Sequence, residues 1–160
     1  MRPANAVTMS DIDTIVVATD GSDSVGRAVD AALDLATRFD AAVHALYVVD
    51  SGEVDSSPEA VRDQMRHALQ EHGGEAIVEV QRRADRDVTA VVREGRPANE
   101  IADYAREIDA DLVAAGTRGR HGENRFLIGS VAERVVRICP VPVLTVRQLE
   151  GDDAGVDAPA

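Results

Sequence analysis

The sequence predicts an α/β domain with a single doubly wound, five-stranded parallel sheet and helices on both faces. Short apolar runs alternate with longer segments whose apolar residues recur at helical spacing. This alternation implies right-handed crossovers between parallel strands. The short runs are nearly continuous in apolar residues, as expected for strands covered on both faces. With 160 residues, the chain has the length of one domain.

The first two strands and the first helix are expected before residue 50. A strand is predicted at 14–19, where the apolar run is almost unbroken, and a second strand at 42–49. Between them, an apolar stripe predicts a helix at 25–39. The segment 50–57 is short and polar, and it is predicted to be a loop.

A long helix is expected next. Ser57 followed by Pro58 is typical of a helix start, with serine as the cap and proline at the first helical position. A stripe of apolar residues then predicts one helix over 58–84. The Gly73-Gly74 pair is its weak point, because each glycine costs about 1 kcal/mol in a helix. A break or kink could occur there.

The second half of the chain repeats the alternation. Strands are predicted at 87–93, 112–115 and 141–147, a helix at 101–108, and a last helix from Ser130 onward. In such sheets, ligands bind beyond the carboxyl ends of the strands, where the strand order reverses. The segments that follow the strands are therefore the expected place for a binding site.

The two ends of the chain are expected to lie outside the folded domain. Residues 1–10 show no periodicity and are predicted to form a flexible tail. Residues 149–160 are acidic and rich in small side chains, which predicts a disordered acidic tail. The domain itself is expected over residues 11–148.

The charge balance argues against nucleic acid as a partner. The chain has 29 acidic and 17 basic residues and a net charge of −12, whereas binding a nucleic-acid backbone needs a basic surface. No apolar run approaches the roughly 20 residues of a membrane span, and the first residues lack an apolar signal core. We therefore expect no membrane partner and a cytoplasmic location. Cys139 is the only cysteine, which excludes an internal disulfide and a cysteine zinc site.

The kind of charged residue suggests adaptation to salt. All 17 basic residues are arginine, and aromatic residues make up only 2% of the chain. Strong acidity without lysine is typical of proteins from a salt-rich cytoplasm, although a GC-rich genome also favours arginine. At about 1 M salt the Debye length is about 3 Å, so self-repulsion would be largely screened. We therefore hypothesise a halophilic protein.

One glycine-rich segment carries the clearest functional pattern. Its spacing is Gly116-x2-Gly119-x9-Gly129-Ser130, between a predicted strand and a predicted helix. Glycines allow positive φ angles and bring backbone N–H groups close to an anion, and a helix start adds free N–H donors and a positive dipole end. This arrangement favours phosphate binding, although a tight turn would also call for glycines.

The spacing resembles the nucleotide-binding signature of the universal stress protein family, in its ATP-binding branch. Four more segments stand in the family's order and extend the resemblance over residues 11–147. They are Ile15–Ser22, Leu46–Asp50, Glu94–Pro97 and Cys139–Val146. The resemblance implies a Rossmann-like sheet with strand order 3-2-1-4-5, which periodicity alone does not give.

The resemblance also implies a ligand and a partner. The ligand is ATP, with Mg²⁺ or Mn²⁺ held through its phosphates, and the partner is a second copy that pairs antiparallel through strand Val141–Arg147. The residues at the family's ATP-binding positions are Thr19, Asp20, Val48, Gly116, Thr117, Arg118, Gly119, Gly129, Ser130 and Val131. Arg120 and Arg125 are further candidates for phosphate contacts.

Several of these residues have an alternative role. Asp20 matches a residue that acts near the ribose, but it could instead organise the turn that it begins. Val48 would offer only backbone groups to adenine, and its side chain could be ordinary core. Ser130 and Glu133 form a capping-box pattern, in which the serine oxygen accepts from the N–H three residues on. The loop arginines could simply be solvated.

The pattern indicates binding of a nucleotide and not its cleavage. The loop is not Gly-x4-Gly-Lys-Ser/Thr, the chain has no lysine, and it has no Gly-x-Ser-x-Gly elbow. We therefore expect a universal stress protein that holds ATP as a regulatory or sensing ligand, with no catalytic residue. A slow ATP hydrolase and a nucleotide-independent interaction protein are the alternatives, and AMP, ADP and cyclic AMP are alternative ligands. His44, His67 and His72 lack a metal-ligand pattern and are interpreted as structural.

Overall fold

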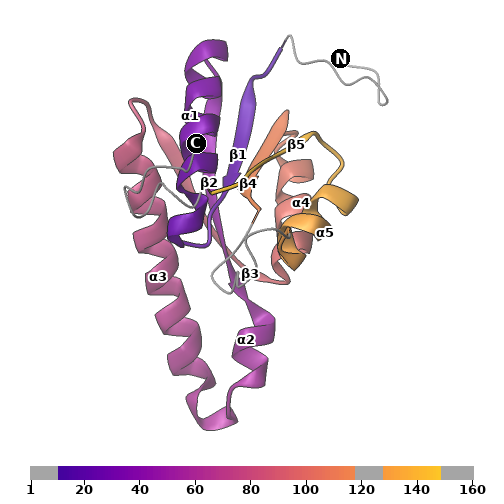
Figure 1. The fold of residues 1–160 in the computed structure, drawn as a ribbon. Helices are drawn as coiled ribbons and strands as arrows, with labels where there is room; N and C mark the ends of the chain where they lie inside the picture. Colours follow the sequence, from indigo (N-terminus) through magenta and orange to yellow (C-terminus); the bar gives the residue numbers. More distant parts are fainter. Residues whose placement is uncertain (1–10, 118–127, 149–160) are drawn as a thin grey trace, which may run out of the picture.

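The computed structural model describes residues 11–117 and 128–148, which contain a five-stranded parallel sheet (Figure 1). The strand order is β3-β2-β1-β4-β5, as the resemblance implied. The central strand pairs on both sides, with Ile15 opposite Val43 on one neighbour and Leu112 on the other. The strands are β1 (Thr14–Ala18), β2 (Ala42–Asp50), β3 (Val88–Gly95), β4 (Leu112–Gly116) and β5 (Val143–Val146).

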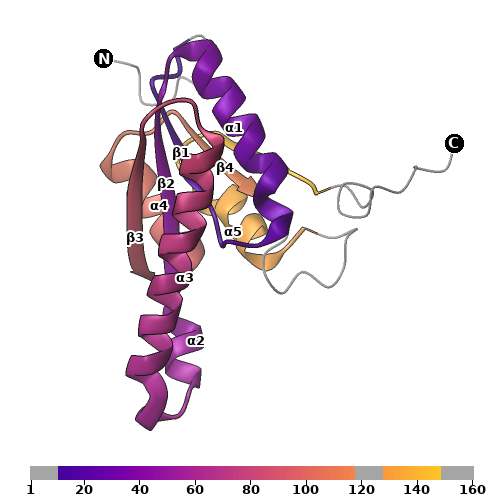
Figure 2. The same cartoon turned by 90° about the vertical axis from the view of Figure 1, so that its left-hand side faces the viewer.

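Helices cover both faces of the sheet. In Figure 1, α1 and α3 lie on one face, and α4 and α5 lie on the other. Figures 1 and 2 show that α2 and the start of α3 extend past the carboxyl ends of the strands. The helical elements are η1 (Asp23–Val25), α1 (Gly26–Phe39), α2 (Ser51–Ser56), η2 (Glu59–Val61), α3 (Arg62–Arg83), α4 (Pro97–Glu107) and α5 (Ser130–Ile138).

Strand β1 supplies both halves of the core. Ile15 and Val17 pack on the side of α1 and α3, whereas Val16 and Ala18 pack on the side of α4 and α5. Successive side chains of a strand point to opposite faces, so a strand between two helical layers must be apolar at every position. This explains the unbroken apolar run that predicted the strand.

The prediction of a loop over residues 50–57 is wrong, because this segment contains α2. Asp50 caps this short helix, since its Oδ1 accepts a hydrogen bond from the Gly52 N–H at 2.9 Å. Val54 anchors the helix and is 0% exposed. One buried apolar residue in a polar segment of six is too weak a pattern to predict a helix from periodicity.

The predicted helix start at Ser57 and Pro58 is also wrong. Ser57 ends α2, Pro58 precedes the 3₁₀ turn η2 without a side-chain cap, and α3 begins only at Arg62. At the other end of the domain, α4 begins at Pro97, earlier than predicted, because proline fits the first turn of a helix.

The Gly73-Gly74 pair does not interrupt α3, which is continuous over 22 residues. Gly73 lies against the buried ring of Tyr47, and a Cβ at this position would collide with that ring. The glycine therefore lets α3 pack closely on β2. Gly74 has open space around it, so the two adjacent glycines have different reasons to be there.

The capping-box prediction for Ser130 is wrong. Gly129 occupies the cap position of α5 and Ser130 is the first helical residue. The Glu133 N–H donates to the Gly129 carbonyl at 2.9 Å and not to the serine side chain. Because the cap is Gly129, Ser130 is the first residue of the helix, and its backbone N–H belongs to the first turn.

Candidate functional site

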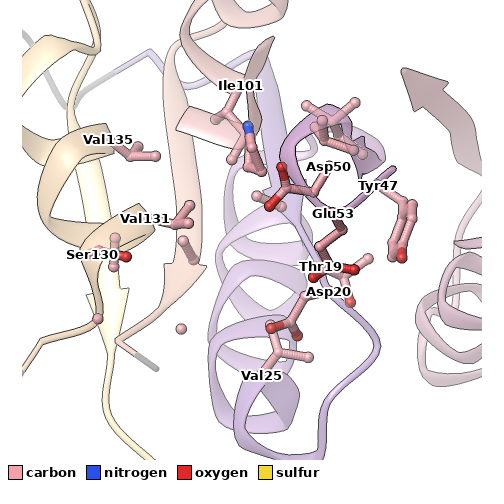
Figure 3. A pocket seen from close by; sticks show the side chains of 18 residues that line it. Thr19, Asp20, Val25, Tyr47, Asp50, Glu53, Ile101, Ser130, Val131 and Val135 are labelled. Carbon is pink, nitrogen blue, oxygen red and sulfur yellow. The ribbon is translucent and has the colours of Figure 1, made fainter. Parts of the chain in front are cut away.

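A cavity of about 220 Å³ lies where the carboxyl ends of β1, β2 and β4 meet the start of α5 (Figure 3). This is the point at which the strand order reverses, since β1 connects outward to β2 and β4 lies on its other side. Most of the residues predicted from the sequence line this cavity. They are Thr19, Asp20, Val48, Gly116, Gly129, Ser130 and Val131.

The other predicted residues have different places. Thr117 does not line the cavity. Its carbonyl accepts from the Gly129 N–H at 2.5 Å, and its N–H donates to the Val146 carbonyl at 3.3 Å. The first bond holds the end of β4 beside the start of α5, and the second joins it to β5. The remaining four predicted residues, Arg118, Gly119, Arg120 and Arg125, lie outside the described residues.

The interior of the cavity is mainly apolar. Four buried apolar residues line it, namely Leu46, Ile101, Ala115 and Val135. Their side chains offer a ligand apolar contact and no hydrogen bonds. Apolar walls with a few polar groups at defined places are typical of small-molecule sites, because the walls give affinity and the polar groups fix orientation.

Three carboxylates lie on one side of the cavity. Figure 3 shows Asp20, Asp50 and Glu53 together there, across from Ser130 and Val131 of α5. Each comes from the carboxyl end of a strand or the segment after it: Asp20 follows β1, Asp50 ends β2, and Glu53 lies on α2. Ionised carboxylates only accept hydrogen bonds, so this side of the cavity suits a ligand that donates them.

The start of α5 forms the opposite side of the cavity. Gly129 is extended at φ −68° and ψ 158°, and the helix then begins at Ser130. The N–H groups of the first helical turn have no partner within their own helix, and the helix dipole adds positive potential at this end. The cavity is therefore acidic on one side and anion-attracting on the other.

The turn after β1 has a structural role in its own right. Asp20 Oδ1 accepts from the Ser22 N–H at 2.9 Å and from the Ser22 hydroxyl at 2.6 Å. The Gly21 N–H donates to the Thr19 hydroxyl at 3.1 Å, and Gly21 has a positive φ of 77°. The turn role considered for Asp20 is thus confirmed, and the same residue also lines the cavity.

Sequence reasoning missed three polar residues of the site. Asp50 ends β2 just as Asp20 follows β1, so its place at a strand end was a usable signal. Glu53 reaches the cavity only because α2 turns it there, and the sequence predicted no helix at that position. Tyr47 is 1% exposed yet lines the cavity, which its position in an apolar strand did not reveal.

Within the described residues, no cluster of histidine, cysteine and carboxylate side chains could hold a metal ion. His44 Nδ1 lies 2.7 Å from the Tyr104 hydroxyl, and burial lowers the pKa of this histidine below its usual value. His67 forms an exposed pair with Glu71, with 3.2 Å between Nε2 and Oε1. None of the helices in the described ranges is long and apolar enough to cross a membrane.

Comparison with known proteins agrees with this architecture. The model of the universal stress protein family matches residues 11–147. The chain belongs to the universal stress protein family. A universal stress protein of Methanocaldococcus jannaschii is 41% identical over 138 residues, which covers 84% of this chain and 81% of that relative.

Solved universal stress proteins share the fold. UspA from Lactobacillus plantarum superposes with a TM-score of 0.73 at 27% identity, covering 86% of this chain and 99% of that chain. A universal stress protein solved in complex with cAMP superposes with a TM-score of 0.63 at 28% identity, covering 86% of this chain and 98% of that chain. The Rossmann-like sheet expected for this universal stress protein is thus confirmed.

Proposed function

We propose that this universal stress protein binds ATP in the cavity at the strand ends and uses it as a regulatory or sensing ligand. The observation that carries the proposal is the polarity of the cavity, which has carboxylates on one side, the start of α5 on the other and apolar walls between them. A nucleotide has matching chemistry, with hydrogen-bond donors on its base and ribose, an apolar ring face, and an anion at the other end.

The polarity gives the ligand a direction. The amino group of adenine and the ribose hydroxyls would face Asp20, Asp50 and Glu53, because these side chains accept hydrogen bonds and would repel phosphate. The phosphates would face Ser130 and Val131, where the first N–H groups of α5 and the helix dipole favour an anion. Thr19, Val48, Gly116 and Gly129 would complete the binding site between these ends.

The rest of the glycine pattern would complete the phosphate side. Arg118, Gly119, Arg120 and Arg125 belong to the segment that joins β4 to α5, and arginine binds phosphate in bidentate geometry. We propose that Mg²⁺ or Mn²⁺ is held through the phosphates, because the described carboxylates lie on the other side of the cavity. The solved complex of a relative with cAMP supports an adenine nucleotide as the class of ligand.

A negative charge added at the start of α5 tests whether the phosphates of ATP bind there. Ser130→Glu introduces a residue that favours the helix, since an acidic side chain in the first turn stabilises it, but it places a negative charge beside the expected phosphates. Calorimetric titration with ATP and Mg²⁺ in potassium chloride should show affinity reduced by about tenfold or more, since an added like charge near the phosphates costs at least about 1.4 kcal/mol.

Thr37→Glu is the matched control, because it adds the same charge at an exposed site of α1, on the far face of the sheet from α5. It should bind ATP as the wild type does. Equal binding by Ser130→Glu and the wild type would contradict the proposed phosphate position. Absence of binding by the wild type would favour the nucleotide-independent alternative, and turnover well above background would favour the hydrolase.

We further propose that the protein is a cytoplasmic homodimer adapted to a salt-rich environment. The dimer proposal is supported by the position of β5 at the edge of the described sheet, where a second copy could add its own β5. The salt proposal is supported by the net charge of −12 and the absence of lysine. The cytoplasmic location stays a prediction from the sequence.

A further inference from the structure

His72 of α3 contacts the binding site from outside. Its Nε2 lies 3.0 Å from the backbone carbonyl oxygen of Asp20, which lines the cavity. A carbonyl oxygen only accepts hydrogen bonds, so Nε2 carries a hydrogen and donates a hydrogen bond to the Asp20 carbonyl. The interaction joins residues 52 positions apart in the sequence and connects α3 to the turn after β1.

The same imidazole contacts a second residue of the cavity. The rings of His72 and Tyr47 meet edge to face, with their centroids 5.8 Å apart and their planes at 72°. Tyr47 lines the cavity at the carboxyl end of β2. One side chain outside the cavity therefore contacts two of its walls, one through a hydrogen bond and the other through a ring contact.

One glycine makes room for this histidine, and a second lets its helix approach Tyr47. A Cβ at Gly21 would lie 2.6 Å from His72 Nε2, and Gly21 has φ +77°, which other residues rarely adopt. Gly73 lets α3 approach the ring of Tyr47. The close approach of His72 to the turn thus depends on two positions at which the chain has no side chain.

The position of the Asp20 carboxylate depends on this turn. Its Oδ1 is held by the N–H and hydroxyl of Ser22, so the carboxylate moves with the backbone of residues 20–22. We propose that His72 is a positioning residue of the nucleotide site, which fixes this turn so that Asp20 meets the ribose hydroxyls. The proposal rests on the proposed function and adds to it a residue that does not touch the nucleotide.

Three variants separate this role from simple packing. His72→Leu removes the donor but keeps an apolar side chain against Tyr47. His72→Gln keeps an N–H donor near the place of Nε2, so it should restore most of what leucine loses. His67→Leu is the control, because His67 lies on the same helix with 73% of its side chain exposed. Circular dichroism should show that all three variants are folded.

The first readout is affinity for ATP and for 2′,3′-dideoxyadenosine triphosphate. His72→Leu should weaken ATP binding by about five- to tenfold, which is the usual effect of losing one hydrogen bond, here the one proposed between Asp20 and the ribose. Binding of the dideoxy analogue should hardly change, because this analogue lacks the hydroxyls that Asp20 would meet. An equal loss for both ligands, or no loss in a folded variant, would overturn the proposal.

The second readout needs no ligand. Hydrogen exchange at the Ser22 amide, which donates to Asp20 at 2.9 Å, should be faster in His72→Leu than in the wild type and unchanged in His67→Leu. Unchanged exchange in His72→Leu would also overturn the proposal. If the wild type bound no ATP while the exchange results held, the proposed function would fail and His72 would still be shown to position the turn.

Discussion

At the scale of single residues, Gly73 and Gly74 show how packing decides between two identical neighbours. Alanine at Gly73 would push a Cβ into the ring of Tyr47, whereas alanine at Gly74 would meet nothing within 4 Å. We expect Gly73→Ala to destabilise the protein by about 1–3 kcal/mol through overpacking. Gly74→Ala should be neutral or stabilise by up to about 1 kcal/mol, because alanine favours a helix.

Urea denaturation of the two variants measures this difference. A midpoint that is lowered in Gly73→Ala but unchanged or raised in Gly74→Ala, at unchanged slope, would support the packing role of Gly73. Two equal shifts would mean that only helix propensity matters at this pair. The sequence could predict that the pair was unusual, but it could not predict Tyr47 as the reason, because that contact joins α3 to a different element.

His44 predicts a pH dependence of stability. Burial lowers its pKa from the usual 6.5, so the unfolded chain binds the proton more readily than the folded chain does. Its contribution to stability is therefore complete above the unfolded pKa and is lost as the pH falls below it. His44→Asn, which keeps a polar group near Tyr104, should lose less stability than the wild type between about pH 7.5 and pH 5.5.

Urea midpoints at several pH values compare the two proteins. A His44→Asn curve that ran parallel to the wild-type curve would show that His44 titrates alike in the folded and unfolded chains, and it would contradict the prediction.

At the scale of elements, β5 pairs with β4 on one side and, among the described residues, with no strand on the other. The carbonyl of Pro142 accepts from the Val113 N–H, and the carbonyl of Val146 accepts from the Thr117 N–H. The backbone carbonyls of Pro142 and Val146 therefore face β4. Because a strand alternates with period two, the backbone N–H of Thr145 faces outward. This N–H lies on the side where a second copy of the chain would pair in the proposed dimer.

Thr145→Pro should therefore remove the dimer and leave a folded monomer, since proline lacks the N–H and is tolerated on edge strands. Thr145→Val keeps the N–H and should remain dimeric. Light scattering at tens of micromolar distinguishes the two masses. A monomeric wild type, or a dimeric proline variant, would count against pairing through β5.

The regular elements were the predictable part of the fold, and the short ones were not. The strands and α1 follow from apolar patterns to which many residues contribute, as in the unbroken apolar run Ile15–Ala18 of β1. The helix α2 depends on one cap, Asp50, and one anchor, Val54, so its pattern is no stronger than chance. The start of α5 was predicted correctly at Ser130, but its cap was misplaced by one residue, because both Gly129 and Ser130 are good caps.

At the scale of the whole molecule, the charge predicts a dependence on salt. The chain carries 29 acidic and 17 basic residues, and the excess charge opposes the compact state. Screening should raise the melting temperature as potassium chloride increases from about 0.1 M to about 2 M. Thermal unfolding followed by circular dichroism measures this, and a melting temperature that did not rise would remove the main support for the halophile hypothesis.

The candidate site was predictable where it follows topology. In a sheet of this order, the carboxyl ends of β1, β2 and β4 must converge, so Asp20, Val48 and Gly116 could be expected to lie together. Glu53 could not be expected beside Asp20 and Asp50, because it reaches the cavity through α2. The fold thus shows more of how a ligand would be oriented than the glycine pattern did.

The orientation of the nucleotide is the central claim, and amide shifts in a titration test it most directly. Adenosine should shift the amides of Asp20 and Val48 but leave those of Ser130 and Val131 unchanged, because it has no phosphate. ATP with Mg²⁺ should shift all four. Shifts at Ser130 and Val131 that were as large with adenosine as with ATP, or absent with both, would contradict the proposed orientation.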